Sequence, residues 1–440
     1  MTDTRNGRLG WLDALRGLAA LTVTWFHLSP QMIGHDRHLQ IFRHVDLGKY
    51  GVLLFFLVSG YVIPMSLERH GSLRRFWIGR LFRIYPAYLL SAALTLVLTA
   101  TGLLAVPASL RQETVTGVLG HITMMQEFLG VRGLVRVFWT LSYEMTFYLV
   151  VAGLFVWRLH RLSAWWAAGL ATAAVLGGAV LPDNLFTATF ADRRITAVVL
   201  LVLVGGSIAG YLSGRRTPAT IAATIGLLFV LLPALNGSPT RWSSTAGSWQ
   251  ALLMLSVMFA GTVVYRAERG QLRARAAAAA LSAVAAGLCV DAWMQTGQPA
   301  QRALWIANTA AVAGTFAVAF AVRRRRMPRA LTGLGAVSFS LYVLHPLVLV
   351  GFAAVFPDSP GASPIVTVAT GLLYGAVALA VAALSYRLVE RPGQALGARL
   401  LAALDRRLGP DRAGPPPPGA IATQRALSRT GRGENVGASV

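Results

Sequence analysis

The sequence alternates long apolar runs with short polar segments over most of its length. Twelve of these runs have the roughly 17 to 25 residues that a helix needs to cross the hydrocarbon core of a bilayer. They lie at residues 10–30, 51–67, 82–106, 137–157, 164–181, 195–213, 217–234, 250–266, 276–292, 302–322, 331–354 and 364–388. We therefore predict an all-α fold, a polytopic integral membrane bundle of about 10–12 transmembrane helices.

The composition supports a membrane protein over a soluble one. Of 440 residues, 55% are hydrophobic and 13% are charged, and the mean hydropathy is +0.57. A net charge of +23 would suit a nucleic-acid ligand, but most arginines lie in short segments between apolar runs, which is typical of membrane topology. We therefore expect the lipid bilayer as a partner and no nucleic acid. The single cysteine, Cys289, excludes an intramolecular disulfide framework, and no metal site is expected.

The Lys and Arg residues predict how the chain crosses the membrane, because cytoplasmic loops carry the excess of these residues. With the N-terminus inside, 29 of the 40 fall in inner segments and 10 in outer segments. Both termini are therefore expected in the cytoplasm, with the chain in the inner (plasma) membrane of a bacterium. Residues 31–50 run against this trend, since they carry Arg37, Arg43 and Lys49 on the outer side. Residues 1–392 are predicted to form the transmembrane domain, and residues 393–440 a disordered, basic, Pro/Gly-rich cytoplasmic tail.

Ionisable residues inside the apolar runs are the first candidates for function. Arg16 and His27 are eleven residues apart, about three helical turns, so both project from nearly the same face of the first run. Asp13 lies one turn before Arg16 and can pair with it. A structural ion pair with a core histidine is the alternative interpretation. By residue count, His27, Glu144 and His345 share the outer half of the membrane, although the count does not show that their helices are neighbours.

A second group of candidates lies in the cytoplasmic segment before residue 82. Five arginines in so short a segment satisfy the positive-inside rule without any further role. The alternative is an anion site, because guanidinium groups bind phosphate through two parallel hydrogen bonds. The arginines are Arg69, Arg74, Arg75, Arg80 and Arg83. The last two are one turn apart and lead directly into the third run.

Six motifs, taken in order, give the chain a resemblance to a known family. They are "LDALRGLAALTVTWFH", "GVLLFFLVSGYVI", "RRFWIGRLFRIYPAYLL", "FWTLSYEMTFYLV", "FSLYVLHPLVL" and "YRLVERP". From about residue 9 to 393 the chain resembles the membrane acyltransferase family 3. Such proteins transfer acyl groups, usually acetyl from acetyl-CoA, to hydroxyls of sugars, polysaccharides, peptidoglycan, lipids or macrolide-type metabolites. The resemblance implies that His27 is the essential histidine, that Arg16, Arg80 and Arg83 are the family's arginines, and that Glu144 is its fourth-span glutamate.

Two departures from the family pattern affect what the resemblance implies. Family members often have ten spans, and residues 195–322 match only loosely. Many relatives that act on cell-wall polymers carry a fused extracytoplasmic domain, which we do not find in this sequence. Direct transfer to a small or lipid-linked acceptor is therefore expected.

The candidate residues suit acyl transfer from a thioester to a hydroxyl. His27 is the expected general base, Glu144 is expected to orient its imidazole, and Arg16 to hold the anionic donor. The resemblance implies that acyl-CoA, usually acetyl-CoA, is the donor substrate. No permanently bound cofactor is expected. The donor-binding residues expected in the loop are Arg74, Arg75, Arg80 and Arg83, with Asp13, Trp139, Ser142 and His345 in support. A covalent route through Ser142 stays open.

A proton-coupled secondary transporter is the main alternative function. Twelve spans and intramembrane His and Glu residues would fit such a protein. Against it, the two halves of the chain show no repeat. A purely structural scaffold would leave the buried ionisable groups unexplained.

Overall fold

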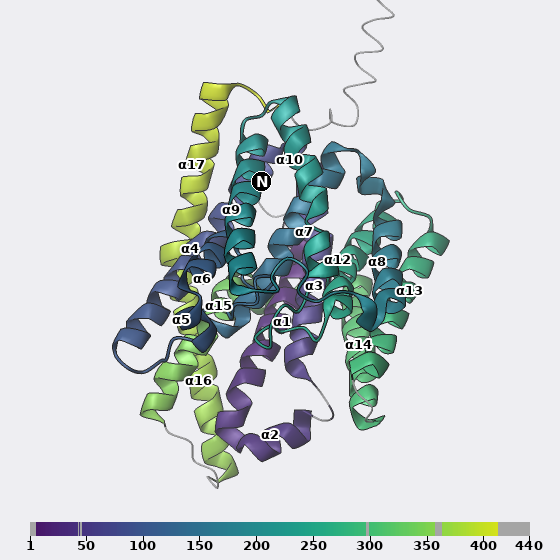
Figure 1. Ribbon diagram of the computed structural model, residues 1–440. Coiled ribbons are helices and arrows are strands. Elements are labelled where there is room, and N and C mark those ends of the chain that lie inside the picture. The colour runs from purple at the N-terminus through teal and green to yellow at the C-terminus, as the bar shows by residue number, and fades with distance from the viewer. Residues whose placement is uncertain (1–5, 43, 45, 296–298, 357–362, 412–440) are drawn as a thin grey trace, which may run out of the picture.

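The computed structural model describes residues 6–42, 44, 46–295, 299–356 and 363–411. Within these ranges the regular structure is entirely helical and contains no strand, which confirms the predicted all-α bundle. Figure 1 shows the long helices packed side by side, with α2 and α17 at opposite ends of the bundle. The helices are α1 (Asn6–Ile33), α2 (His35–Phe42), α3 (Leu47–His70), α4 (Leu73–Ala100), α5 (Ala108–Gln112), α6 (Thr114–Thr123), α7 (Trp139–Val156), α8 (Ser163–Gly177), α9 (Phe190–Leu212), α10 (Arg216–Leu228), α11 (Leu231–Leu235), α12 (Ser248–Glu268), α13 (Ala274–Gln295), α14 (Pro299–Ala321), α15 (Arg329–Val355), α16 (Pro364–Ser385) and α17 (Arg391–Leu408).

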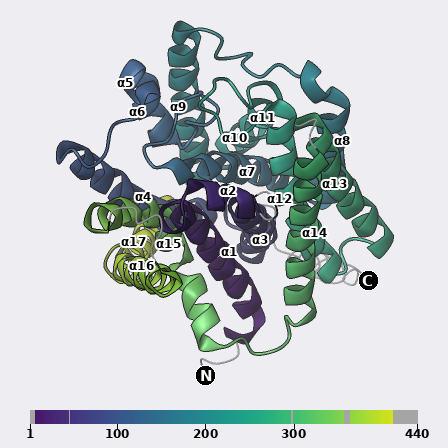
Figure 2. The ribbon, with the colours of Figure 1, turned by 90° about the horizontal axis from the view of Figure 1, so that it is seen from below.

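Eleven helical segments in the described ranges are long and apolar enough to cross a membrane. They correspond to the eleven apolar runs that follow the first one, although the run 82–106 extends six residues beyond the end of α4, and the run 217–234 falls on α10 and α11 together. The first run lies in α1, which is not among the eleven because Asp13, Arg16 and His27 lower its hydropathy. With 28 residues, α1 is still about 42 Å long and therefore long enough to span. It packs between α3 and α15 inside the bundle, as Figure 2 shows, so we keep it as a twelfth span.

The contact between α1 and α15 depends on two glycines. A Cβ atom at Gly335 would lie 2.2 Å from the carbonyl oxygen of Asp13, and one at Gly17 would lie 2.7 Å from the side chain of Leu334. The backbones therefore approach as closely as only glycine allows. Later residues of α1 meet later residues of α15, so the two helices run in the same direction. This parallel arrangement brings His27 of α1 close to His345 of α15.

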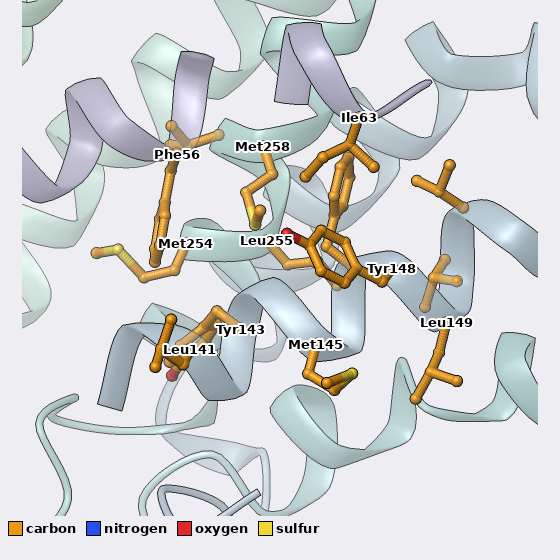
Figure 3. Close-up of a cluster of buried hydrophobic side chains, with 14 of the residues drawn as sticks. Phe56, Ile63, Leu141, Tyr143, Met145, Tyr148, Leu149, Met254, Leu255 and Met258 are labelled. Carbon is orange, nitrogen blue, oxygen red and sulfur yellow. The ribbon is translucent and has the colours of Figure 1, made fainter. Parts of the chain in front are cut away.

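The centre of the bundle is formed by α3, α7 and α12. The apolar stretches of α7 and α12 are almost wholly buried, so these helices are enclosed by protein and not by lipid. Figure 3 shows the side chains that fill the space between the three helices. Phe56 and Ile63 come from α3, Tyr143 and Tyr148 from α7, and Met258 from α12. A residue of α7 such as Glu144 is therefore held inside the protein.

The C-terminal part of the chain corrects one prediction. Residues 391–408 form the helix α17, which packs on α4 with Gly397 against the ring of Phe82. The predicted disordered tail therefore does not begin at residue 393, and the part of it from 412 to 440 lies outside the described residues. The sequence did not predict this helix because only one of its faces is apolar. Its average hydropathy is therefore as low as that of a disordered polar segment.

Arg74 fastens α17 and the segment after it to the bundle. Its side chain is fully buried, and Nη1 donates to the carboxylate of Asp405 at 2.7 Å and to the carbonyl oxygen of Gly409 at 2.8 Å. Nε and Nη2 donate to the carbonyl oxygens of Leu212 and Ser213 at 2.9 and 3.2 Å. One guanidinium thus joins α4, the end of α9 and the end of α17.

We expect Arg74→Ala to destabilise the protein by about 3 kcal/mol, because an ion pair to the half-exposed Asp405 is lost and three carbonyl oxygens lose the buried guanidinium that they contact. Thermal unfolding of the detergent-solubilised protein measures this effect. Arg75→Ala is the matched control, since Arg75 is the next residue of the same helix and is exposed. An Arg74→Ala protein that melts at the wild-type temperature would contradict the anchoring role.

Candidate active site

Two histidines from neighbouring helices form the centre of the candidate site. His27 of α1 and His345 of α15 lie within hydrogen-bond distance, with 3.1 Å between His27 Nδ1 and His345 Nε2. His345 is completely buried, and its own backbone carbonyl oxygen accepts a hydrogen bond from the Tyr374 hydroxyl at 3.0 Å. The structure therefore brings together two residues that the sequence placed only at similar depths.

The hydrogen bonds define the tautomers of both rings. His345 Nδ1 faces the carbonyl oxygen of Leu341 at 3.1 Å, so this nitrogen carries the proton and Nε2 is an acceptor. His27 Nδ1 faces the carbonyl oxygen of Val23 at 3.0 Å and the acceptor nitrogen of His345, so it is also protonated. The remaining nitrogen, His27 Nε2, therefore holds an unshared lone pair. It is the basic atom of the pair.

His27 lies on the wall of a cavity of about 590 Å³ at the end of the bundle near α2. We call this space the outer cavity, after the predicted topology. Its walls come from α1, the start of α3, the segment 127–139 and the segment 241–245. Its charged and aromatic lining includes Asp46, Lys49, Glu127, Arg132, Arg136, Trp139, Arg241, Trp242 and Tyr342.

A second, smaller cavity of about 60 Å³ is lined by residues of α1, α3, α4, α7 and α15. We call it the inner cavity. Three cationic side chains line it together with an acid and its tyrosine partner. They are Arg16, Arg80, Arg83, Glu144 and Tyr148. Val52 and Tyr342 line both cavities, so only a thin layer of side chains separates them.

Glu144 faces the inner cavity and does not contact His27. Its carboxylate accepts a hydrogen bond from Tyr148, one turn further along α7, and the guanidinium carbon of Arg80 lies 5.6 Å from the centre of the Tyr148 ring. The predicted orienting contact between Glu144 and His27 is therefore wrong, and His345 takes that place. The residue count gave similar depths, but it did not show which face of α7 Glu144 occupies.

The structure separates the predicted loop arginines into two kinds. Arg80 and Arg83 line the inner cavity. Arg74 binds Asp405 of α17 and lines neither cavity. Arg75 is exposed and also lines neither cavity. The prediction that Arg74 and Arg75 bind the donor is therefore corrected. Spacing along the helix could not show this, because Arg74 takes its partners from far along the chain.

The supporting residues also differ in their placement. Trp139 lines the outer cavity, whereas Ser142 lines neither cavity and its completely buried hydroxyl accepts the backbone N–H of Glu127 at 3.3 Å. Ser142 is therefore a structural group in this conformation and is poorly placed as a nucleophile. The ion pairs of the described residues do not include one between Asp13 and Arg16.

Sequence reasoning missed Glu127, which lies on the wall of the outer cavity. Its buried carboxylate accepts hydrogen bonds from the backbone N–H and the hydroxyl of Ser244, which ties two outer segments together. Burial raises the pKa of Glu127 to about 7. A single acid between apolar residues in "MMQEFL" was the available signal, but it lies outside the apolar runs. Among the described residues, no group of three or more acids, histidines or cysteines is arranged to hold a metal ion.

The helical bundle and its two polar cavities define a multi-pass membrane protein with a histidine pair beside the layer that separates the cavities. The model of the acyltransferase 3 family, described as an acyltransferase domain, matches residues 9–265 and 199–387. These segments cover most of the chain, so the chain belongs to this family.

Three curated relatives are similar over part of their length. The acyltransferase MdmB of Streptomyces mycarofaciens is 31% identical over 180 residues, which are 38% of this chain and 45% of that protein. The exopolysaccharide production protein ExoZ of Rhizobium meliloti is 31% identical over 194 residues, 42% of this chain and 57% of that protein. Nodulation protein 10 of Rhizobium leguminosarum is 29% identical over 211 residues, which are 41% of this chain and 52% of that protein. The chain thus spans about half the length of the curated relatives it matches. No solved structure matches it significantly.

Proposed function

We propose that this chain is a membrane-embedded O-acyltransferase that moves an acyl group, most simply acetyl, from acyl-CoA to a hydroxyl. The acceptor is a carbohydrate, a lipid-linked molecule or a secondary metabolite, classes that agree with the printed names of the relatives. Family membership supports acyl transfer over the alternative of a secondary transporter. The observation that carries the proposal is a basic histidine nitrogen and an arginine cluster on opposite sides of one thin layer.

The inner cavity supplies the donor site in this proposal. Arg80 and Arg83 lie on α4 near its cytoplasmic start, where they can hold the phosphates of acyl-CoA outside the membrane core. Arg16 lines the same cavity as Arg80 and Arg83. With about 60 Å³, the cavity is too small for the whole donor, so only the acyl end of acyl-CoA would enter it. The thioester then comes to the layer between the two cavities from the inner side.

The outer cavity supplies the acceptor site and the base. His27 Nε2 takes the proton of the acceptor hydroxyl as its oxygen attacks the thioester carbon, and the C–S bond breaks to release the CoA sulfur. The proton returns from His27 to the sulfur, so the products are an ester and CoA thiol. When Nε2 is protonated, the imidazolium donates from Nδ1 to the neutral His345, which stabilises the charge without a carboxylate.

The proposal predicts that Arg80→Ala and Arg83→Ala weaken the use of the donor more than that of the acceptor. A lost charged hydrogen bond to phosphate should raise the apparent KM for acyl-CoA about tenfold or more, with a smaller change in the acceptor KM. Steady-state kinetics with labelled acetyl-CoA and a panel of sugar and macrolide acceptors measure both constants. Arg75→Ala, an exposed change on the same helix, serves as the control. An unchanged donor KM in both variants would show that Arg80 and Arg83 do not bind the donor.

A further inference from the structure

The outer cavity gathers more positive charge than the proposed chemistry needs. Lys49 from α3, Arg132 and Arg136 from the segment before α7, and Arg241 from the segment before α12 all line it. None of the ion pairs found in the described part of the chain involves these four side chains. Four cations from three separate segments therefore converge on one space.

The acids in the same lining are already used by the fold. Asp46 is the N-cap of α3, and its carboxylate accepts the backbone N–H of Lys49 at 2.8 Å. Glu127 accepts hydrogen bonds from Ser244. Burial raises the pKa of both carboxyl groups, that of Glu127 to about 7. Even with both acids ionised, the four cations outnumber them. The cavity lining is therefore net positive.

Membrane topology does not account for these cations. The positive-inside rule explains Lys and Arg residues at the cytoplasmic end, whereas this cavity opens at the end that the charge distribution places outside. Aromatic rings hold two of the side chains in place: Lys49 Nζ lies 3.6 Å from the centre of the Trp305 ring, and the Arg241 guanidinium carbon 4.7 Å from that of Trp242. Like charges that are gathered and positioned in this way repel one another unless an anion lies between them.

We propose that the outer cavity is a binding site for a phosphate or diphosphate group carried by the acceptor. The inference rests on the proposed function, because it names the chemical class of the molecule that receives the acyl group. Arg132 and Arg136 supply planar guanidinium groups suited to phosphate oxygens, and Lys49 adds a point charge. The volume of about 590 Å³ leaves space for a sugar ring next to the phosphate and His27.

Inorganic pyrophosphate is the probe for this site. Purified protein in phosphatidylcholine nanodiscs is first saturated with CoA, which occupies the donor site, and is then titrated with pyrophosphate in a calorimeter. Arg132→Gln and Arg136→Gln should each weaken pyrophosphate binding about tenfold or more and leave the Kd of CoA unchanged. Arg194→Gln is the matched control, because Arg194 is exposed on the same expected side and does not line the cavity; it should change neither value.

Competition then identifies the source of the phosphate. Glucose 1-phosphate in solution and phosphatidic acid in the nanodisc are tested separately against pyrophosphate, and displacement by the first indicates a soluble acceptor, by the second a lipid-linked one. Pyrophosphate binding that is equal in the wild type and both variants would overturn the inference. A CoA affinity that falls in step with pyrophosphate would also overturn it, since the cations would then belong to the donor site.

The two proposals can fail separately. Acyl transfer to a phosphate-bearing acceptor with wild-type rate and acceptor KM in Arg132→Gln and Arg136→Gln would leave the proposed function standing and remove the phosphate site. If pyrophosphate binding depends on these arginines but the protein transfers no acyl group, the phosphate site stands and the proposed function fails.

Discussion

His27→Ala should lower the rate of acyl transfer by about 10²- to 10⁴-fold, the contribution typical of general acid–base catalysis. The substitution removes His27 Nε2, the nitrogen whose lone pair is not used by the hydrogen bond between the two histidines. His27 lines the outer cavity, whereas His345 does not. The helix itself should persist, because alanine is a good helix former and α1 is held by α3 and α15 on both sides.

The measurement is the turnover of labelled acetyl-CoA by purified protein in liposomes, together with thermal unfolding to check the fold. His70→Ala provides the control, because His70 is an exposed histidine in the last turn of α3 and is remote from both cavities. Substantial turnover by a folded His27→Ala protein would exclude His27 as the base.

His345→Leu is expected to lower turnover by about 10- to 100-fold, the usual effect of removing a group that orients a catalytic histidine. Leucine fills most of the space but cannot accept the proton of His27 Nδ1, so the His27 imidazolium loses its stabilising partner. The imidazolium should then give up its proton more readily, so the rising limb of the rate against pH should move to lower pH.

Glu144→Gln is the matched comparison for His345→Leu. Glu144 is bonded to Tyr148 in the inner cavity, so its replacement should affect donor use and leave the pH dependence of the histidine step in place. Both variants are assayed over a pH series at saturating donor. A pH profile that changes in Glu144→Gln and stays wild-type in His345→Leu would restore the carboxylate as the orienting group and contradict the histidine pair.

The sequence predicted the helical segments well, because each apolar run carries its own signal. All twelve runs correspond to helices, and α1 was identified even though its polar residues lower its hydropathy. Arg80 and Arg83, which the sequence singled out by their spacing, both line the inner cavity. These features depend on local spacing and charge alone.

Features that depend on which helices are neighbours could not be predicted. The contact between His27 and His345 requires the close parallel packing of α1 on α15, and Arg74 finds its partners more than a hundred residues further along the chain. Depth along an axis also does not determine the face of a helix, which is why Glu144 was expected beside His27 and instead lines the inner cavity. Arg132, Arg136 and Arg241 of the outer cavity come from segments between the long helices, where hydropathy carries no periodic signal.

The central claim is that the donor enters from the inner side and that His27 acts as the general base for direct transfer of the acyl group to a hydroxyl in the outer cavity. Inside-out and right-side-out vesicles from cells that make this protein, and therefore contain its natural acceptor, allow a direct test with membrane-impermeant labelled acetyl-CoA. We predict labelled ester and one free CoA thiol per ester in inside-out vesicles, little of either in right-side-out vesicles, and neither with His27→Ala. Equal ester formation from both sides, or wild-type inside-out vesicles that release no CoA and form no ester, would contradict the account.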